Sequence, residues 1–241
     1  MTKVLPLPLL FILLSLPGCA WFQESPPLPA AELASEARGE FAAGQYTTAL
    51  ELFEELMDRF PFSSYSLMAE LKIADCHYYQ GHYGEAIAAY ESFQENHPAN
   101  EANAYALFQV AMSHYNQIDT IDRDPAGAHN AIAVFNRLIR TYPKSPYVEE
   151  SRARVAAARN FLANHELYVA SYYLKTDRLQ QAAGRLQFLL DNYPESTAAP
   201  EAKRTLALLK EGRKPEGSWR DWLPEIGLPD WETFKDVGGP R

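Results

Sequence analysis

The stretch DRDPAGAHNAIAVFNRLIRTYPKSPY, residues 122–147, contains one well-marked amphipathic helix. Asp124 is placed to cap its start, and Pro125 suits the first turn because the missing N–H of proline leaves no intrahelical bond unmade. Tyr142-Pro143 ends the helix, since proline disfavours helical geometry in the residue before it. The apolar residues recur at helical spacing and form one stripe: Ala128, Ala131, Ile132, Phe135, Leu138, Ile139 and Tyr142. A single helix cannot bury such a stripe alone, so the stretch predicts packing against further helices.

The same order of small residue, two large residues, ring and proline recurs four times. The copies are Ala49, Phe53, Leu56, Phe60 and Pro61; Ala86, Tyr90, Phe93, His97 and Pro98; Ala131, Phe135, Leu138, Tyr142 and Pro143; and Ala182, Leu186, Leu189, Tyr193 and Pro194. A small residue also recurs in the preceding helix of each copy, as Ala37, Ala74, Ala111 and Ala170. Small residues let two helices approach closely, and proline stops the second one. The pattern predicts an all-α, tetratricopeptide-like right-handed α-solenoid of about five helical hairpins.

The spacing between copies divides the chain into two groups of repeats. Residues 30–145 would form repeats 1–3, and residues 146–212 a long connecting helix with repeats 4–5. Between Pro146 and Lys175 no proline or glycine occurs, which predicts one helix of about thirty residues or two end to end. A last helix, roughly 197–211, would cap the stack.

Residues 213–241 form a tail rich in proline, glycine and tryptophan. It contains Trp219, Trp222 and Trp231, and every tryptophan of the chain lies outside the repeats. Glycine and proline at this density oppose a packed core of the tail's own. Its tryptophans therefore either fold back on the solenoid or dock on a partner, because interfaces favour tryptophan.

The amino-terminal residues 1–18 are expected to be a signal peptide. A basic Lys3 precedes an apolar run that is too short for a stable membrane span. The sequence Leu16-Pro17-Gly18-Cys19 resembles a bacterial lipobox, which implies that Cys19 becomes the lipidated first residue and that residues 19–29 form an extended tether. Ala20 resembles the second residue of lipoproteins sent to the outer membrane. The alternative is an ordinary cleaved signal with an incidental cysteine.

Composition excludes several classes of function. The 241 residues are 47% hydrophobic with a net charge of −9, which argues against a nucleic-acid binder. With two cysteines a disulfide framework is not expected, and Cys76 is predicted to be a packed thiol. Neither paired metal-ligand motifs nor a glycine-rich phosphate loop occurs, so no metal, cofactor or catalytic site is expected and the protein is predicted not to be an enzyme.

The repeat pattern also predicts a binding groove. In tetratricopeptide proteins, particular positions of each first helix line the concave face. An aromatic surface of this kind suits an extended or helical peptide, although any single ring could equally belong to the core. Carried onto this chain, the lining residues are Phe41, Leu71, Tyr78, Tyr79, Tyr105, Phe108, Met112 and Tyr115.

Several motifs resemble the BamD family, the lipoprotein of the outer-membrane β-barrel assembly (BAM) machine. They are Arg59-Phe60-Pro61-Phe62-Ser63-Ser64-Tyr65-Ser66, Asp122-Arg123-Asp124-Pro125, Tyr142-Pro143-Lys144-Ser145-Pro146-Tyr147 and Tyr168-Val169-Ala170-Ser171-Tyr172-Tyr173. The resemblance covers about residues 19–211. Phe62 and Tyr65 lie in the first motif, where they either contact the ligand or shape the turn between repeats.

The resemblance implies a lipid-anchored scaffold in the outer membrane, facing the periplasm. Its amino-terminal repeats would bind the carboxy-terminal signal of unfolded outer-membrane proteins. Its carboxy-terminal repeats would dock on a periplasmic domain of the barrel-forming subunit, with Tyr173 and Arg185 as candidate contacts, and other lipoproteins of the machine would be further partners. The alternative is a periplasmic tetratricopeptide lipoprotein that acts as an adaptor for envelope or peptidoglycan maintenance.

Overall fold

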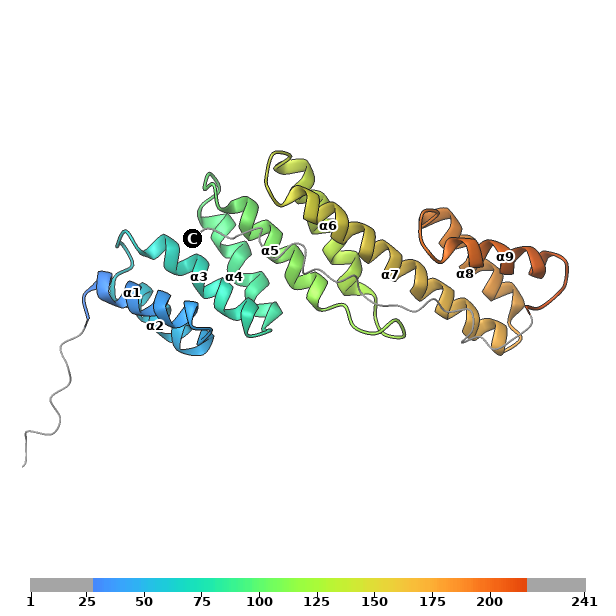
Figure 1. The fold of residues 1–241 in the computed structure, drawn as a ribbon, viewed down its shortest axis with the longest axis horizontal. Helices are drawn as coiled ribbons and strands as arrows, with labels where there is room; N and C mark the ends of the chain where they lie inside the picture. The colour runs from blue at the N-terminus through green and yellow to red at the C-terminus, as the bar shows by residue number, and fades with distance from the viewer. Residues whose placement is uncertain (1–27, 216–241) are drawn as a thin grey trace, which may run out of the picture.

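The computed structural model describes residues 28–215, and this part of the chain is entirely helical (Figure 1). The first six helices are α1 (Ala30–Ala42), α2 (Tyr46–Arg59), α3 (Ser66–Tyr79), α4 (Tyr83–Asn96), α5 (Asn103–Asn116) and α6 (Ala126–Thr141). They are followed by α7 (Val148–Lys175), α8 (Leu179–Asn192) and α9 (Ala199–Lys210). Within residues 28–215, no helix combines the length and apolar character needed to cross a bilayer.

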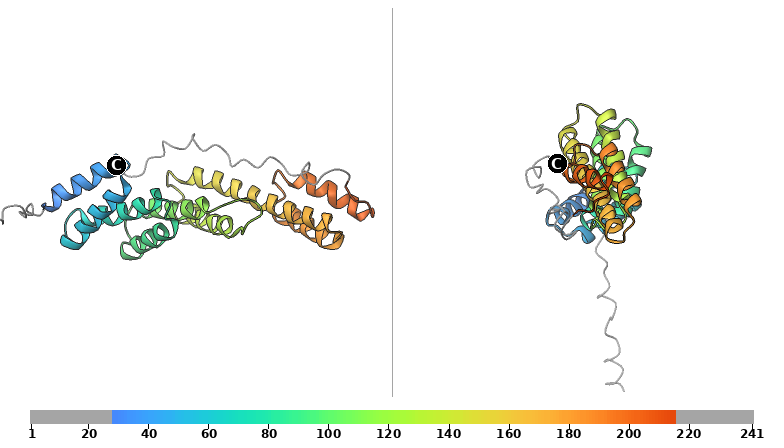
Figure 2. Two further views of the ribbon diagram at one scale, coloured as in Figure 1. Left: turned by 90° about the horizontal axis from the view of Figure 1, so that it is seen from below. Right: turned by 90° about the vertical axis from the view of Figure 1, so that its right-hand side faces the viewer.

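The helices stack as consecutive hairpins into an elongated array (Figure 2). Each helix packs mainly against the one before and the one after it; α5 also touches α3 and α7. Pairs α1–α2, α3–α4, α5–α6 and α7–α8 form four hairpins, and α9 follows as a single helix. The prediction of an all-α, tetratricopeptide-like solenoid is confirmed.

The repeated small and large residues form the core. The small first-helix residues Ala37, Ala74, Ala111 and Ala170 are all fully buried. The three second-helix positions are likewise at most 1% exposed in every copy: Ala49, Phe53 and Leu56; Ala86, Tyr90 and Phe93; Ala131, Phe135 and Leu138; Ala182, Leu186 and Leu189. Close-packed interiors tolerate little change of volume, so this recurrence reflects one packing solution used four times.

Two turns between paired helices depend on glycine. Gly44 and Gly81 have φ angles of +78° and +77°, in the left-handed region that glycine enters without a Cβ clash. Asp177 takes the corresponding place between α7 and α8 with φ of +58°. Asp is one of the few other residues that visits this region as a single residue.

The stripe of residues 122–147 is the inner face of α6. Phe135 and Leu138 are fully buried, and Ile132 packs at the edge of the same core. The helix begins at Ala126 after Pro125, and the Oδ1 atom of Asp124 accepts a hydrogen bond of 2.9 Å from the Ala126 N–H. Asp124 therefore satisfies a free amide at the helix start, but from one residue before the N-cap position, which Pro125 occupies instead of the first helical turn predicted for it.

Helix α7 is one continuous helix of 28 residues. Its first half packs against α6 and its second half against α8. Ala170, the small residue of the fourth copy, lies in the second half. One helix thus links repeats 1–3 to the hairpin of the fourth copy.

Candidate functional site

The first two hairpins carry a group of five contacting rings, Phe41, Tyr46, Tyr78, Tyr79 and Tyr83, here called the aromatic cluster. Tyr46 stacks on Tyr79 with ring centroids 4.9 Å apart, and Phe41 meets both rings edge-on at 5.4 and 5.7 Å. Tyr78 meets Tyr79 at 5.3 Å and Tyr83 at 5.8 Å. The rings come from the ends of α1 and α3 and the starts of α2 and α4, so both hairpin turns contribute to one surface.

The aromatic cluster is partly open to solvent. Tyr79 is 50% exposed, and the other four rings are half-buried. The Nζ atom of Lys72 lies 4.3 Å from the centroid of Phe41, where the negative face of the ring attracts it. Burial raises the pKa of Tyr78 to about 12, so its hydroxyl stays protonated at physiological pH. This surface offers ring faces, hydroxyl groups and a cation to a ligand.

A buried carboxylate joins the aromatic cluster to the core. Asp75 is 1% exposed, and its Oδ1 atom accepts hydrogen bonds from the hydroxyls of Tyr90 at 2.5 Å and Tyr105 at 2.8 Å. Lys72 donates to its Oδ2 atom at 2.8 Å. Burial, together with the negative charge of Asp75, raises the pKa of both tyrosines well above the ordinary value of 10. The contacts connect α3, α4 and α5, and hence the second and third repeats.

The structure corrects the predicted groove at the third repeat. Tyr105, Phe108, Met112 and Tyr115 are only 3–8% exposed, and Leu71 is 7% exposed. They were expected to line an open face, but they belong to the core of the chain.

The cause is the segment that follows the third repeat. Tyr147 stacks on Phe108 with ring centroids 4.8 Å apart, and the Arg154 guanidinium on α7 lies 5.0 Å from the centroid of the Tyr115 ring. Of the eight first-helix positions predicted to line the groove, Phe41, Tyr78 and Tyr79 are accessible.

The turn between α2 and α3 displays one further ring. Phe62 is fully exposed, whereas Tyr65 is half-buried. The turn itself is held by serines, because Ser66 Oγ donates to the Phe60 carbonyl at 2.8 Å and Ser63 Oγ accepts from the Tyr65 N–H at 3.3 Å. The serines therefore shape the turn, while the exposed side chain of Phe62 is free to contact a ligand.

The carboxy-terminal half has a separate exposed surface. Arg185 Nη1 lies 3.2 Å from Glu166 Oε2, and its side chain is 46% exposed. Tyr173 is half-buried, and its ring meets that of Tyr172 at 5.9 Å. Tyr172 is 55% exposed and Phe188 46% exposed. Neither Tyr172 nor Phe188 was predicted from the sequence as a partner contact.

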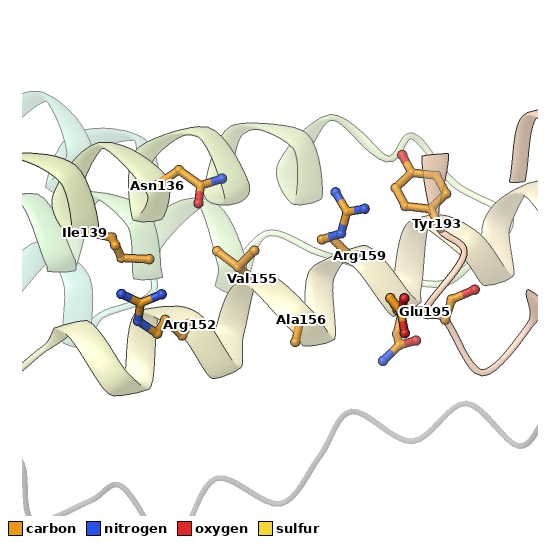
Figure 3. A pocket seen from close by; sticks show the side chains of 10 residues that line it. Asn136, Ile139, Arg152, Val155, Ala156, Arg159, Tyr193 and Glu195 are labelled. Carbon is orange, nitrogen blue, oxygen red and sulfur yellow. The ribbon is translucent and has the colours of Figure 1, made fainter. Parts of the chain in front are cut away.

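Residues 28–215 form at least two pockets between repeats. One of about 570 Å³ is lined by Tyr105, Tyr142, Pro143, Pro146 and Tyr147, with Glu101 and Lys144 among its other residues. The second, of about 370 Å³, lies where α6, α7 and the turn between α8 and α9 meet (Figure 3). Residues 28–215 contain no group of three His, Cys, Asp or Glu side chains that could hold a metal ion.

Some predicted features lie outside the described residues. They are Cys19 with the signal peptide, most of the tether, and the three tail tryptophans. Cys76, in contrast, lies among the described residues and is a buried free thiol, as predicted. Burial raises its pKa to about 12, which leaves almost no reactive thiolate at neutral pH.

Comparison with known proteins finds relatives over most of the chain. The profile of the YfiO family, described as outer membrane lipoprotein, matches residues 26–214. A Vibrio cholerae protein named outer membrane protein assembly factor BamD is 32% identical over 184 residues, covering 72% of this chain and 76% of its own. Proteins of the same name from Pasteurella multocida and Neisseria meningitidis serogroup A are 28% and 30% identical, covering 80% and 73% of this chain and 77% and 70% of their own.

Among solved structures, a thermophilic TPR protein of Thermus thermophilus aligns with 74% of this chain and 97% of its own, with a TM-score of 0.40 and 17% identity. The family match extends from just before α1 to the end of the described residues. This chain therefore belongs to the YfiO family of outer membrane lipoproteins, which includes the BamD proteins.

Proposed function

We propose that this protein is a non-catalytic scaffold for the assembly of outer-membrane β-barrel proteins, held at the outer membrane by lipid on Cys19 and facing the periplasm. Support comes from the relatives, which are named outer membrane protein assembly factors. The observation that carries the proposal is the aromatic cluster, because partly exposed rings at this density mark a binding surface. Such a scaffold acts by holding a client and a partner subunit at once.

The client site is the aromatic cluster with Phe62. The carboxy-terminal signal of an unfolded barrel protein typically ends in an aromatic residue, and ring-to-ring contacts contribute about 0.5–1.5 kcal/mol each beyond buried area. Lys72, which already lies beside Phe41, supplies a cation near the negatively charged end of such a peptide. Tyr105 acts indirectly, since its hydroxyl is committed to Asp75.

Binding of a labelled peptide that ends in phenylalanine tests this site. Tyr46→Ala combined with Tyr79→Ala removes two stacked rings, and the loss of about 1–3 kcal/mol predicts affinity lower by roughly five- to 150-fold. Tyr172→Ala is the matched control, because Tyr172 is exposed to a similar degree but lies on α7. Unchanged affinity in the double variant, with its helical content intact, would disprove the assignment.

The docking site is the surface around Arg185 and Tyr173. Arg185 is nearly half exposed, so its guanidinium retains donors for a carboxylate of the barrel-forming subunit besides Glu166. Arg185→Glu should therefore reduce recovery of that subunit when the protein is isolated from detergent-solubilised membranes. Arg204→Glu is the control, because it makes the same charge change at an arginine that is 72% exposed but lies on another helix, α9. Recovery of only peptidoglycan or division proteins with the unmodified chain would contradict the assembly function.

A further inference from the structure

The smaller pocket described above lies along the first half of α7 and is hereafter the α7 pocket. Arg152, Val155 and Arg159 follow one another along the helix, and Tyr193 and Glu195 lie at one end (Figure 3). The pocket thus offers an apolar floor between two cations, together with one carboxylate. Arg152 is 60% exposed, and the nearest carboxylate oxygen, on Glu149, is 3.8 Å away.

One polar group in the wall of the α7 pocket has no partner within the described residues. Ser196 is 9% exposed, and its Oγ atom makes no hydrogen bond. By contrast, its neighbours are engaged: the Asn160 side chain accepts from the Thr197 N–H at 3.0 Å, and Arg159 donates to the Asn192 carbonyl at 2.6 Å. A buried hydroxyl without a partner is destabilising, so it points to a polar group that enters the pocket.

We propose that the α7 pocket is occupied by the chain's own carboxy-terminal tail, with Trp222 beside Arg159 and Glu225 beside Arg152. The part of the tail beyond the described residues, 216–241, carries six carboxylates and three basic side chains, so its net charge is opposite in sign to that of the arginine pair. Asp221 precedes the tryptophan and Glu225 follows it. Arginine binds carboxylates through paired donors and also stacks on aromatic rings. The carboxylates and the tryptophan of the tail are therefore both suited to the two arginines of the pocket.

The place where the described chain ends fixes which tryptophan reaches the pocket. Lys214 forms an ion pair with Asp177 in the turn between α7 and α8. Arg159 lies 18 residues before Asp177, a helical distance of ~27 Å at ~1.5 Å per residue. An extended chain covers this in about eight residues. Eight residues after Lys214 is Trp222.

The other tail residues fit the same path. Trp219 lies only five residues beyond Lys214 and reaches at most ~18 Å, short of Arg159. Arg152 is ~38 Å from Asp177 along the helix, which requires about eleven residues and corresponds to Glu225. Glu225 follows Trp222 by three residues, or ~10 Å when extended, which matches the ~10 Å from Arg159 to Arg152 along the helix. The tail would run back along α7 and cover its contact with α6.

Quenching of tryptophan fluorescence by a nitroxide tests this placement in the full chain. The reporter retains Trp222 alone, with phenylalanine at the other three tryptophan positions. A nitroxide attached through Ala156→Cys, exposed in the α7 pocket, should reduce the emission to less than half of that with a diamagnetic label. The same label on Ala104→Cys, in the larger pocket, should leave it unchanged. The reporter without an added cysteine, treated identically, gives the baseline.

Charge reversal supplies the second arm of the test. Arg152→Glu should abolish most of the quenching from position 156, and added salt should weaken it, because exposed ion pairs are screened. Arg137→Glu is the control, since Arg137 is exposed on α6 and does not line the pocket. Quenching from position 104 instead, or from neither position, would overturn the proposal and would place the tail in the larger pocket or off the solenoid.

Discussion

Tyr90→Phe should destabilise the chain through the buried carboxylate of Asp75. The substitution keeps the ring, which is fully buried, so no cavity forms and only the hydroxyl is lost. That hydroxyl donates to Asp75 Oδ1 at 2.5 Å, and hydrogen bonds to charged groups contribute about 1.5–3 kcal/mol. For a folded unit of this size the loss corresponds to a fall in melting temperature of about 3–12 °C.

Tyr105→Phe removes the second donor to the same oxygen, at 2.8 Å. Each single variant leaves Oδ1 with one donor, whereas the double variant leaves it with none among the described residues. The double variant should therefore lose more free energy of unfolding than the two single variants together, and the difference is a coupling energy of about 0.5–3 kcal/mol. Tyr105 also connects the second repeat to the third, so its loss should act on the interface between them.

Urea unfolding followed by far-ultraviolet circular dichroism near neutral pH measures these free energies. Tyr172→Phe serves as the control, because Tyr172 is 55% exposed and lies away from Asp75. Changes below about 0.5 kcal/mol for both single variants, which is the range of ordinary surface substitutions, would refute the reasoning. Strict additivity in the double variant would show that the two hydroxyls do not share one acceptor.

Three further predictions concern the hairpin turns, the buried tyrosines and the lipid anchor. Gly44→Ala should lower the free energy of unfolding by about 1–2 kcal/mol, because φ is +78° at this position. Gly39→Ala, inside α1 and with free space around it, should raise that free energy by about 0.5–1 kcal/mol. Equal melting temperatures for the two variants would contradict the turn geometry. Burial raises the pKa of Tyr90 and Tyr105 in the folded chain, while tyrosines in the unfolded chain ionise near pH ~10, so the free energy of unfolding should hold below that pH and fall as pH rises above it. Urea titrations at rising pH measure this fall, which Tyr90→Phe should flatten; a slope equal to that of the unmodified chain would argue against the assignment. Cys19→Ser should move the protein from the membrane to the soluble fraction, and retention in cells without the partner subunits would count against lipidation.

Repeated spacing made the fold predictable from the sequence. Each copy places a small residue where two helices approach and large residues beside it, and all of these positions are buried. The absence of proline and glycine before Lys175 predicted a long helix, because nothing in that stretch interrupts helical hydrogen bonding. The packed state of Cys76 followed from its apolar helical surroundings.

The exposure of individual rings was less predictable. Four residues of α5 were assigned to an open groove: Tyr105, Phe108, Met112 and Tyr115. They are covered by Tyr147 and α7, which come later in the sequence. Spacing within one helix does not report what packs on it from another. Tyr46 and Tyr83 were not selected from the sequence, although both rings belong to the aromatic cluster. Each tyrosine lies two residues after the glycine of a hairpin turn. This position could have indicated that the ring faces the end of the preceding helix.

Helix α7 sets both the distance and the rotational phase between the two proposed binding surfaces. Its 28 residues span ~42 Å at ~1.5 Å per residue. Because each residue also turns the helix by ~100°, inserting four residues at its middle would lengthen it by ~6 Å and rotate everything beyond by ~40°. Seven inserted residues would add ~10 Å but only ~20° in the opposite sense. On the proposed function, a client at the aromatic cluster would therefore be presented to a subunit at Arg185 at a fixed angle as well as a fixed distance.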